Sequence, residues 1–234
     1  MSHAVTAIEA AFAARLAGVR ARVAAAAARA GRDPAGVTLI AVSKTQPAET
    51  LCAALAAGMH DFGENYVQEG ATKLRALAAG LCGEGVRPRF HLIGHLQRNK
   101  VRAALGAFAI LHTVDSARLL DAIAAAAPSR PVPIMLQVNV ADDRAKAGVP
   151  VAGLAGLVRA AAGCPAVDLV GLMTIPPADP DPEASRPHFA TLRTLAHAHG
   201  LRALSMGMSN DFEVAIEEGA THIRVGRAIF GERP

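Results

Sequence analysis

Short apolar runs alternate with amphipathic stretches along most of the chain. Runs rich in valine, leucine and isoleucine that are bounded by glycine, proline or polar residues predict buried strands. We expect eight such strands, at residues 37–44, 59–63, 89–94, 109–114, 132–139, 167–173, 203–208 and 222–226. The stretches between them have the apolar spacing and the terminal glycines of helices. These helices are expected at residues 48–57, 64–79, 96–105, 117–127, 151–162 and 211–218, with one more that ends near residue 199 and an alanine-rich helix at residues 5–30.

Regular alternation of strands and helices implies parallel strands joined by crossover helices, and eight such units can close into a barrel. An open doubly wound sheet is the alternative, but the chain has no dinucleotide-binding glycine fingerprint. No proline- or serine-rich linker divides the chain into two compositional halves. We therefore predict an α/β fold, a single (β/α)8 TIM barrel domain over residues 1–234 with an extra helix at its amino terminus.

The net charge of +4 makes the chain basic, yet its basic residues are dispersed. Arg15, Arg20, Arg22 and Arg29 fall on the first helix, where we expect a solvated face. Basic residues are not interleaved with aromatic ones, so a nucleic-acid surface is not expected. No stretch is long and apolar enough to span a bilayer, and the amino terminus has no cleavable apolar core. We expect a cytoplasmic protein without membrane contact.

Cysteine and histidine spacings do not indicate a metal site. Cys52, Cys82 and Cys164 lack CxxC spacing, and we expect reduced thiols, not a disulfide framework. Three histidines near the predicted strands lack HxH or HExxH spacing and are expected to be satisfied within the fold. They are His91, His95 and His112.

Lys44 closes the first predicted strand, directly before a loop that begins with Thr45, Gln46 and Pro47. Lysine is seldom fully buried without a partner. Partial desolvation lowers the pKa of a lysine, and the neutral amine then attacks carbonyl groups such as that of pyridoxal phosphate (PLP). A lysine that extends to solvent or pairs with a carboxylate is the alternative.

Functional loops of such a barrel lie at the carboxyl ends of its strands, and phosphate is often held after strands seven and eight. Residues 205–212 supply glycine, hydroxyl groups and a helix start there, and residues 224–227 supply Gly226 between two arginines. Each segment alone is a weak signal, because glycine after a strand is ordinary turn chemistry. Together with Lys44 on the same rim, they favour a phosphorylated carbonyl ligand, and PLP fits.

Six segments, in order, resemble signatures of the pyridoxal phosphate homeostasis proteins. They are residues 41–47 (AVSKTQP), 62–69 (FGENYVQE), 91–100 (HLIGHLQRNK), 171–176 (GLMTIP), 204–212 (LSMGMSNDF) and 223–233 (IRVGRAIFGER). The resemblance covers the chain from about residue 37 onward. It implies a barrel similar to the amino-terminal domain of alanine racemase and of fold-type III decarboxylases.

The resemblance also implies the cofactor contacts. Lys44 would hold PLP as a Schiff base, and Arg224 would face the pyridine nitrogen and keep it unprotonated, because two adjacent positive charges repel. Ser209, Gly226 and Arg227 would hold the phosphate. The remaining pocket residues implied by the family are Asn65 and Met206.

The chain departs from the family pattern at three places. Arg227 stands where the family usually has threonine or serine, so a hydroxyl bond to the phosphate is lost. The loop at residues 138–148 is a looser copy of the family's stretch and keeps only Lys146 and Gly148 at its end. Thr174 stands where alanine is common.

Racemases and decarboxylases of this fold type use a second domain that supplies an opposing acid–base residue. This chain ends at Pro234, and its only tyrosine is Tyr66. We therefore expect no catalytic residues and a PLP carrier or buffer in the homeostasis of vitamin B6 and of amino and keto acids. The alternative is a weak amino-acid racemase or a related PLP enzyme. Expected partners are PLP, other B6 vitamers and, transiently, PLP-dependent apoenzymes, with the protein a monomer or weak dimer.

Overall fold

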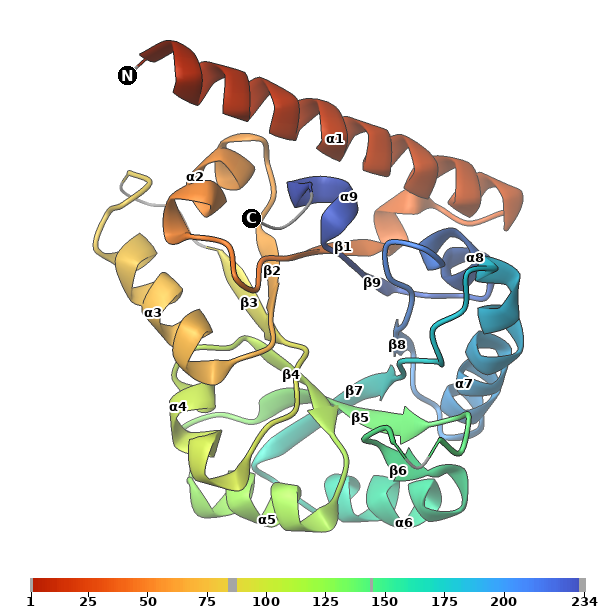
Figure 1. The fold of residues 1–234 in the computed structure, drawn as a ribbon. Helices are drawn as coiled ribbons and strands as arrows, with labels where there is room; N and C mark the ends of the chain where they lie inside the picture. The colour runs from red at the N-terminus through yellow and green to blue at the C-terminus, as the bar shows by residue number, and fades with distance from the viewer. Residues whose placement is uncertain (1, 84–87, 144, 232–234) are drawn as a thin grey trace.

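A closed barrel of parallel strands forms the centre of the protein (Figure 1). The computed structural model describes residues 2–83, 88–143 and 145–231. Within them the barrel strands are β1 (Thr38–Val42), β2 (Asp61–Glu64), β3 (Arg89–Leu92), β4 (Ile110–Val114), β5 (Val132–Asn139), β7 (Val167–Met173), β8 (Ala203–Ser205) and β9 (His222–Val225). Pairing of β4 with β5 closes the sheet, so the closed barrel is confirmed and the open sheet is wrong.

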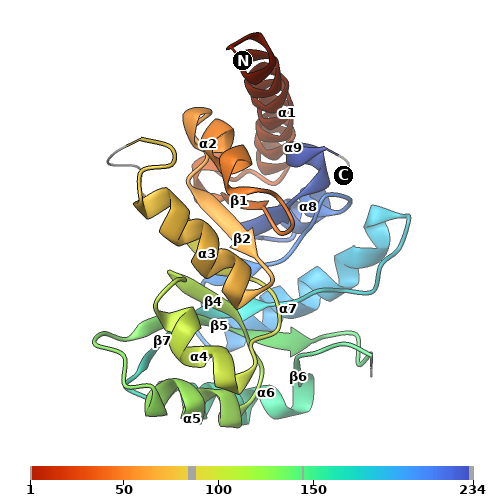
Figure 2. The ribbon, with the colours of Figure 1, turned by 60° about the vertical axis from the view of Figure 1, so that its left-hand side comes forward.

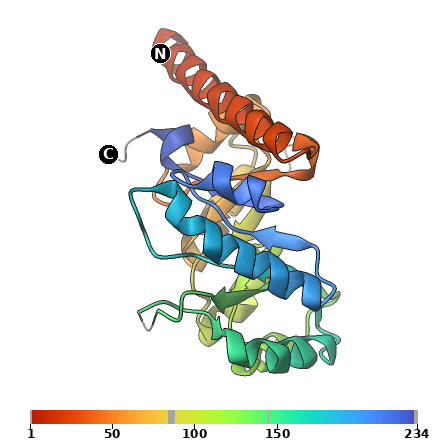
Figure 3. The same cartoon turned by 90° about the vertical axis from the view of Figure 1, so that its right-hand side faces the viewer.

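Helices surround the barrel, as Figures 2 and 3 show from two further sides. They are α1 (Ser2–Arg29), α2 (Ala48–Ala56), α3 (Val67–Ala78), α4 (Val101–Leu105), α5 (Ala117–Ala125), α6 (Val151–Ala162), α7 (Arg186–Ala198), α8 (Phe212–Glu217) and α9 (Arg227–Phe230). Short 3-10 turns precede β1, α4 and α7 at Pro34–Gly36, Arg98–Lys100 and Pro182–Ser185. No helix in the described residues is long and apolar enough to cross a membrane.

The predicted helices and strands are confirmed, with shifts at their ends and two additions. A two-residue strand, β6 (Val149–Pro150), pairs with the end of β5, and α9 follows β9. Ser116 is the N-cap residue of α5, but its side chain makes no capping hydrogen bond. Arg144 and residues 232–233, which belong to segments discussed above, lie outside the described residues.

The expectation of reduced thiols is wrong for two of the three cysteines. Cys52 in α2 and Cys82, beyond the end of α3, form a disulfide with a Cα–Cα distance of 5.1 Å. Helices α2 and α3 are neighbours on the outside of the barrel, which brings together two residues 30 positions apart. Cys164 forms no disulfide.

Helix α1 lies across α2, α8 and α9 (Figure 1). Its buried side chains recur at helical spacing and form one apolar stripe: Phe12, Leu16, Val19, Val23, Ala26 and Ala27. Such a stripe must be covered by other apolar surface, and α2, α8 and α9 lie beneath it.

The arginines of α1 are exposed, as expected of a solvated face, and they also contact neighbouring elements. Arg15 Nε donates to the carbonyl oxygen of Ile229 in α9 at 2.7 Å, and Arg22 Nη2 pairs with a carboxylate oxygen of Glu213 in α8 at 2.8 Å. Arg20 and Arg29 likewise contact Gly58 and Glu217. Long side chains of a helix can therefore read as surface residues in the sequence and still reach across to neighbouring elements.

The apolar stripe, not the ion pairs, should carry most of the docking energy of α1. Leu16→Ala is expected to lower the free energy of unfolding by about 2–5 kcal/mol, because the buried leucine leaves a cavity. Arg22→Ala should cost less than about 1 kcal/mol, because an exposed ion pair is weak. Urea titration followed by circular dichroism measures both. A larger loss for Arg22→Ala than for Leu16→Ala would contradict the assignment.

Candidate functional site

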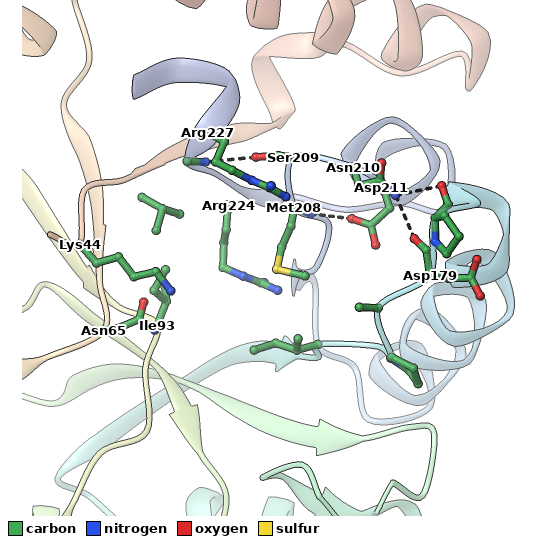
Figure 4. Close-up of a pocket in the computed structure, with 16 residues that line it drawn as sticks. Lys44, Asn65, Ile93, Asp179, Met208, Ser209, Asn210, Asp211, Arg224 and Arg227 are labelled. Carbon is green, nitrogen blue, oxygen red and sulfur yellow. Dashed lines mark hydrogen bonds between the residues drawn. The ribbon is translucent and has the colours of Figure 1, made fainter. Parts of the chain in front are cut away.

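A cavity of about 620 Å³ opens at the carboxyl ends of the barrel strands (Figure 4). Its walls come from the segments after β1, β2, β3, β7, β8 and β9, so residues far apart in sequence meet there. The lining residues are Val42, Lys44, Asn65, Ile93, Ile175, Pro177, Ala178, Asp179, Pro180, Met208, Ser209, Asn210, Asp211, Arg224, Gly226 and Arg227. Six of the seven predicted cofactor contacts are among them.

Lys44 lies two residues beyond the end of β1, whereas the sequence predicted that the strand would continue to it. The amide of Ser43 still donates to the carbonyl oxygen of Gly63 at 3.0 Å, which keeps the chain alongside β2. Thr45 then adopts a left-handed φ of 67° and turns the chain away. The Lys44 side chain, half-buried, extends into the cavity (Figure 4).

A buried ion cluster lies directly behind this turn. Lys73 Nζ donates to the carbonyl oxygen of Ser43 at 2.6 Å and to Oε1 of both Glu64 and Glu69 at 2.7 Å. The Ser43 hydroxyl also donates to Glu64 Oε1 at 2.7 Å. Lys73 is 5% exposed and Glu64 is fully buried, so these charges depend on each other.

The cluster holds the backbone on both sides of Lys44. Lys73 binds the carbonyl group of Ser43, and Glu69 Oε1 accepts the amide hydrogen of Thr45 at 2.6 Å. Two backbone anchors, one before and one after Lys44, fix the turn from which its side chain leaves. Preorganisation of this kind reduces the entropy lost when a side chain reacts in one geometry.

Burial raises the pKa of the Glu64 carboxyl group, although hydrogen bonds from Lys73 and Ser43 oppose this rise. Glu64 Oε2 is buried without a hydrogen-bond partner within the described residues. The carboxylate therefore depends on Lys73 for its charge compensation. Sequence reasoning missed this cluster, but Glu69 and Lys73 are spaced i, i+4 on α3, a pattern that indicates a helical ion pair.

Arg224 extends from β9 into the cavity wall (Figure 4) and is 3% exposed. Its Nη1 donates to Ser205 Oγ at 2.7 Å and its Nη2 to the carbonyl oxygen of Thr174 at 2.9 Å. Burial lowers the pKa of Arg224 to about 10. The guanidinium is therefore a cation at neutral pH, held in a fixed orientation by Ser205 of β8 and by Thr174, the residue after β7.

Ser209, Gly226 and Arg227 meet at one end of the cavity. The amide of Gly226 donates to Ser209 Oγ at 3.4 Å, and α9 begins directly afterwards at Arg227. Arg227 is exposed, and Figure 4 shows it beside Ser209 at the mouth of the cavity. This end presents a hydroxyl group, a backbone amide and a cation, which suits an anionic group.

Asn65 lines the cavity, but Met206 does not. Met206 is fully buried, and its amide donates to the carbonyl oxygen of His222 at 3.1 Å. Gly207 follows with a left-handed φ of 89°, and a Cβ atom there would lie 2.5 Å from Cβ of Ala215. The chain turns at this glycine, and Met208 beyond it lines the cavity.

The loop at residues 138–148 supports the cavity from outside. Lys146 Nζ donates to the carbonyl oxygens of Ile175 and Pro176, at the start of the segment that lines the cavity after β7. Gly148 has a φ of 126°, and a Cβ atom there would lie 2.7 Å from the amide nitrogen of Asn139. Glycine is therefore required for this loop to return to β5.

The histidines have protein partners. His91 hydrogen bonds to Asp61 and His112, and His112 also to Ser205. His95 is exposed, with its Nδ1 3.9 Å from a carboxylate oxygen of Asp115. The described residues contain no group of three or more histidine, cysteine or carboxylate side chains placed to bind a metal ion.

Comparison with known proteins gives three findings. Residues 14–234 match the family described as alanine racemase, N-terminal domain. The pyridoxal phosphate homeostasis protein of Escherichia coli K12 is 42% identical over 229 residues, which cover 93% of this chain and 95% of that protein. The structure of PipY from Synechococcus elongatus with PLP bound superposes with a TM-score of 0.82 at 36% identity, over 94% of this chain and 100% of that chain.

A more distant match shows the fold alone. The alanine racemase of Corynebacterium glutamicum superposes with a TM-score of 0.67 at 19% identity. The match covers 92% of this chain and 61% of the racemase chain. The barrel is thus shared with an enzyme that continues beyond it.

The ion cluster behind Lys44 predicts a pH-dependent loss of stability. Lys73→Met should lower the free energy of unfolding by about 3–5 kcal/mol at pH 8, because buried carboxylates lose their partner. In this variant the pKa of Glu64 in the folded state rises further above its unfolded value. Lowering the pH therefore protonates Glu64 in the folded protein and removes the uncompensated buried charge. The deficit is therefore expected to shrink from pH 8 to pH 5.

Arg75→Met on the same helix provides the matched control, because Arg75 is exposed and contacts only Thr72 among the hydrogen bonds described. Its effect should stay within about 0.5 kcal/mol. Denaturant titration at both pH values tests the pair of variants. Equal losses for the two would mean that the cluster does not stabilise the fold.

Proposed function

Because the chain belongs to the family of pyridoxal phosphate homeostasis proteins, we propose that it binds PLP reversibly in the cavity and acts in the homeostasis of PLP and of amino and keto acid pools. The observation that carries this proposal is the arrangement of Lys44, Arg224 and the Ser209–Gly226 pair around one cavity. A volume of about 620 Å³ falls within the range of cofactor pockets.

PLP supplies an aldehyde that condenses with a primary amine. Lys44 is the lysine that lines the cavity in the described chain, so we assign the covalent attachment to its Nζ. The fixed turn between Ser43 and Thr45 directs the amine, and the cavity wall shields the aldehyde from other amines in the cell. Reversible attachment at this atom is what a carrier requires.

The phosphate is assigned to the opposite end, where Ser209, Gly226 and Arg227 meet. The Ser209 hydroxyl would supply a hydrogen bond, the Gly226 amide would donate to the phosphate in place of its 3.4 Å bond to Ser209 Oγ, and the exposed Arg227 guanidinium would supply charge. Arg227 thus replaces the hydroxyl that the family usually has here. Asn65 lines the wall beside Lys44 (Figure 4).

Arg224 lies between these two ends and is assigned to the pyridine nitrogen. Its guanidinium is charged at neutral pH and only donates hydrogen bonds. A cation at this position disfavours protonation of the ring nitrogen. The ring is then a weaker acceptor of electrons than a protonated one, which suits storage better than turnover.

Two carboxylates, Asp179 and Asp211, line the cavity, and both already accept hydrogen bonds from the protein, which favours the carrier over the enzyme. Asp179, which is exposed, accepts the amide hydrogen of Asp181. Asp211 accepts hydrogen bonds from Ser185 and from the amide of Met208. Tyr66 is 61% exposed and does not line the cavity. Two-base racemisation needs a group on each face of the substrate, and Lys44 serves one face.

Phosphorylated B6 vitamers other than PLP would fit the same phosphate end, and release of PLP to apoenzymes would proceed through the open mouth of the cavity. We expect these contacts to be transient.

Incubation with L-alanine and L-serine followed by chiral analysis separates the carrier from a racemase. Turnover at ordinary enzyme rates would contradict the carrier.

Borohydride reduction tests the attachment site. Wild-type protein loaded with PLP should absorb in the visible range, and reduction followed by peptide mass spectrometry should place the adduct on Lys44. Lys44→Ala should lose both the visible absorbance and the peptide adduct. Lys100→Ala should keep them, because Lys100 lines a separate pocket beside Asn65 and not the cavity. An adduct that persists unchanged in Lys44→Ala would refute the assignment.

The phosphate end predicts a second, separable effect. Ser209→Ala should weaken PLP binding by roughly ten- to a hundredfold, because a hydrogen bond to a charged group contributes about 1.5–3 kcal/mol. Binding of pyridoxal, which lacks the phosphate, should be unchanged. Fluorescence or absorbance titration measures both ligands, with Arg227→Thr as comparator. Equal weakening for PLP and pyridoxal would place the phosphate elsewhere.

A further inference from the structure

A continuous chain of hydrogen bonds crosses the interior of the barrel and ends at Arg224. It joins Arg224 Nη1 to Ser205 Oγ (2.7 Å), Ser205 Oγ to His112 Nδ1 (2.9 Å), His112 Nε2 to His91 Nδ1 (3.0 Å) and His91 Nε2 to Asp61 Oδ1 (2.9 Å). The five side chains come from five strands, and none is more than 9% exposed. Asp61 is the first residue of β2, at the end of the barrel opposite the cavity.

Counting donors and acceptors gives the chain a direction. Arg224 can only donate, so Ser205 Oγ accepts from it. The hydroxyl proton of Ser205 then needs an acceptor, and within the described residues the one in reach is His112 Nδ1. His112 is neutral, because burial together with the nearby His91, His222 and Arg224 holds its pKa well below the usual value. Its proton is therefore on Nε2.

The same reasoning continues to the far end. His112 Nε2 donates to His91 Nδ1, so the proton of His91 is on Nε2 and is donated to Asp61. Burial raises the pKa of Asp61, but the hydrogen bonds from His91 and Arg89 lower this pKa by more than burial raises it, so the net shift is downward. Asp61 is thus an ionised acceptor. Every bond of the chain points from the cation Arg224 towards this anion.

The opposite direction is unfavourable. It would require a proton on His91 Nδ1 and on His112 Nδ1, and the buried Ser205 hydroxyl would lose its acceptor. An unsatisfied buried donor costs about 1–3 kcal/mol. If His91 also kept its proton for Asp61, a further cation would enter an interior that already contains Arg224.

We propose that Asp61, His91 and His112 are positioning residues, which fix the Ser205 hydroxyl and through it the orientation of the Arg224 guanidinium at the cavity. This role rests on the proposed function, because Arg224 matters there as the partner of the cofactor ring. Both hydrogen bonds described for Arg224 go to neutral oxygen atoms. The chain therefore links a buried cation to a carboxylate that it does not touch.

Asp61→Asn should reverse the direction of the hydrogen bonds between position 61 and Ser205. Arg89 Nη2 donates to Asp61 Oδ2 at 2.7 Å, and it would retain the amide oxygen of the asparagine there. The amide NH₂ would then face His91 Nε2, which must become an acceptor. The proton of His91 moves to Nδ1 and that of His112 to Nδ1, a change of tautomer at a residue that does not contact position 61. A loss of local packing alone would not produce this change.

Arg89→Gln is the matched control. It removes the second partner of the same carboxylate, at a side chain that is 64% exposed, and leaves the bond between Asp61 Oδ1 and His91 intact. The tautomers of His91 and His112 should be unchanged in this variant.

Nitrogen-15 NMR of the imidazole rings in the PLP-free protein measures the tautomers directly. Wild type and Arg89→Gln should show His91 and His112 protonated on Nε2, and Asp61→Asn should show both protonated on Nδ1. A wild-type spectrum with either ring protonated on Nδ1 would refute the inferred direction of the hydrogen bonds. This result does not depend on whether Asp61→Asn folds.

PLP titration completes the test. Asp61→Asn should bind PLP about fivefold more weakly, the factor that corresponds to about one hydrogen bond, and Arg89→Gln should bind as wild type. Reversed tautomers with unchanged PLP affinity would refute the positioning role. Wild-type protein that shows the expected tautomers but does not bind PLP would refute the proposed function and leave the direction of the chain supported.

Discussion

The pairing of β1 with β9 is the constraint on which the candidate site depends. It joins the first and the last barrel strand, with Thr38 opposite His222 and Ala41 opposite Val225. Lys44 and Gly226 are separated by most of the chain, yet they leave adjacent strands at the same rim. A Cβ atom on Gly226 would lie 3.4 Å from Cβ of Val42, so the two strand ends are in close contact. Misregister of this pair would move the amine away from the phosphate end.

The barrel itself was predictable from the sequence. The spacing of apolar residues and the glycines and prolines that bound each apolar run are local properties of the sequence. The positions of Lys44 and Arg224 followed from the rule that functional residues lie at the carboxyl ends of strands. That Met208 lines the cavity and Met206 does not was not predictable, because it depends on the turn at Gly207. The disulfide and the arginine contacts of α1 depend on which helices are neighbours, and no local pattern states that.

Two polar networks of different kind support the site. Behind Lys44, two carboxylates and Lys73 are bonded directly, so charges compensate each other over a few ångströms. Below Arg224, neutral groups separate the cation from Asp61, and each hydrogen bond fixes the next. Buried networks rigidify a protein when every member is satisfied, and in the Lys73 cluster Glu64 Oε2 has no hydrogen-bond partner within the described residues. The Arg224 network rests on strands, whereas the Lys73 cluster joins helix α3 to the end of β2 and to the turn after β1.

The contacts of α1 have a consequence for how the chain matures during synthesis. A ribosome releases α1 first, but the surface that receives it includes α8 and α9, and α9 begins at Arg227. Phe12 lies against Phe230, with ring centroids 5.6 Å apart. Domains whose contacts join distant parts of the chain fold late and slowly. The part of the apolar stripe that packs on α8 and α9 therefore stays uncovered until almost the whole barrel has been translated.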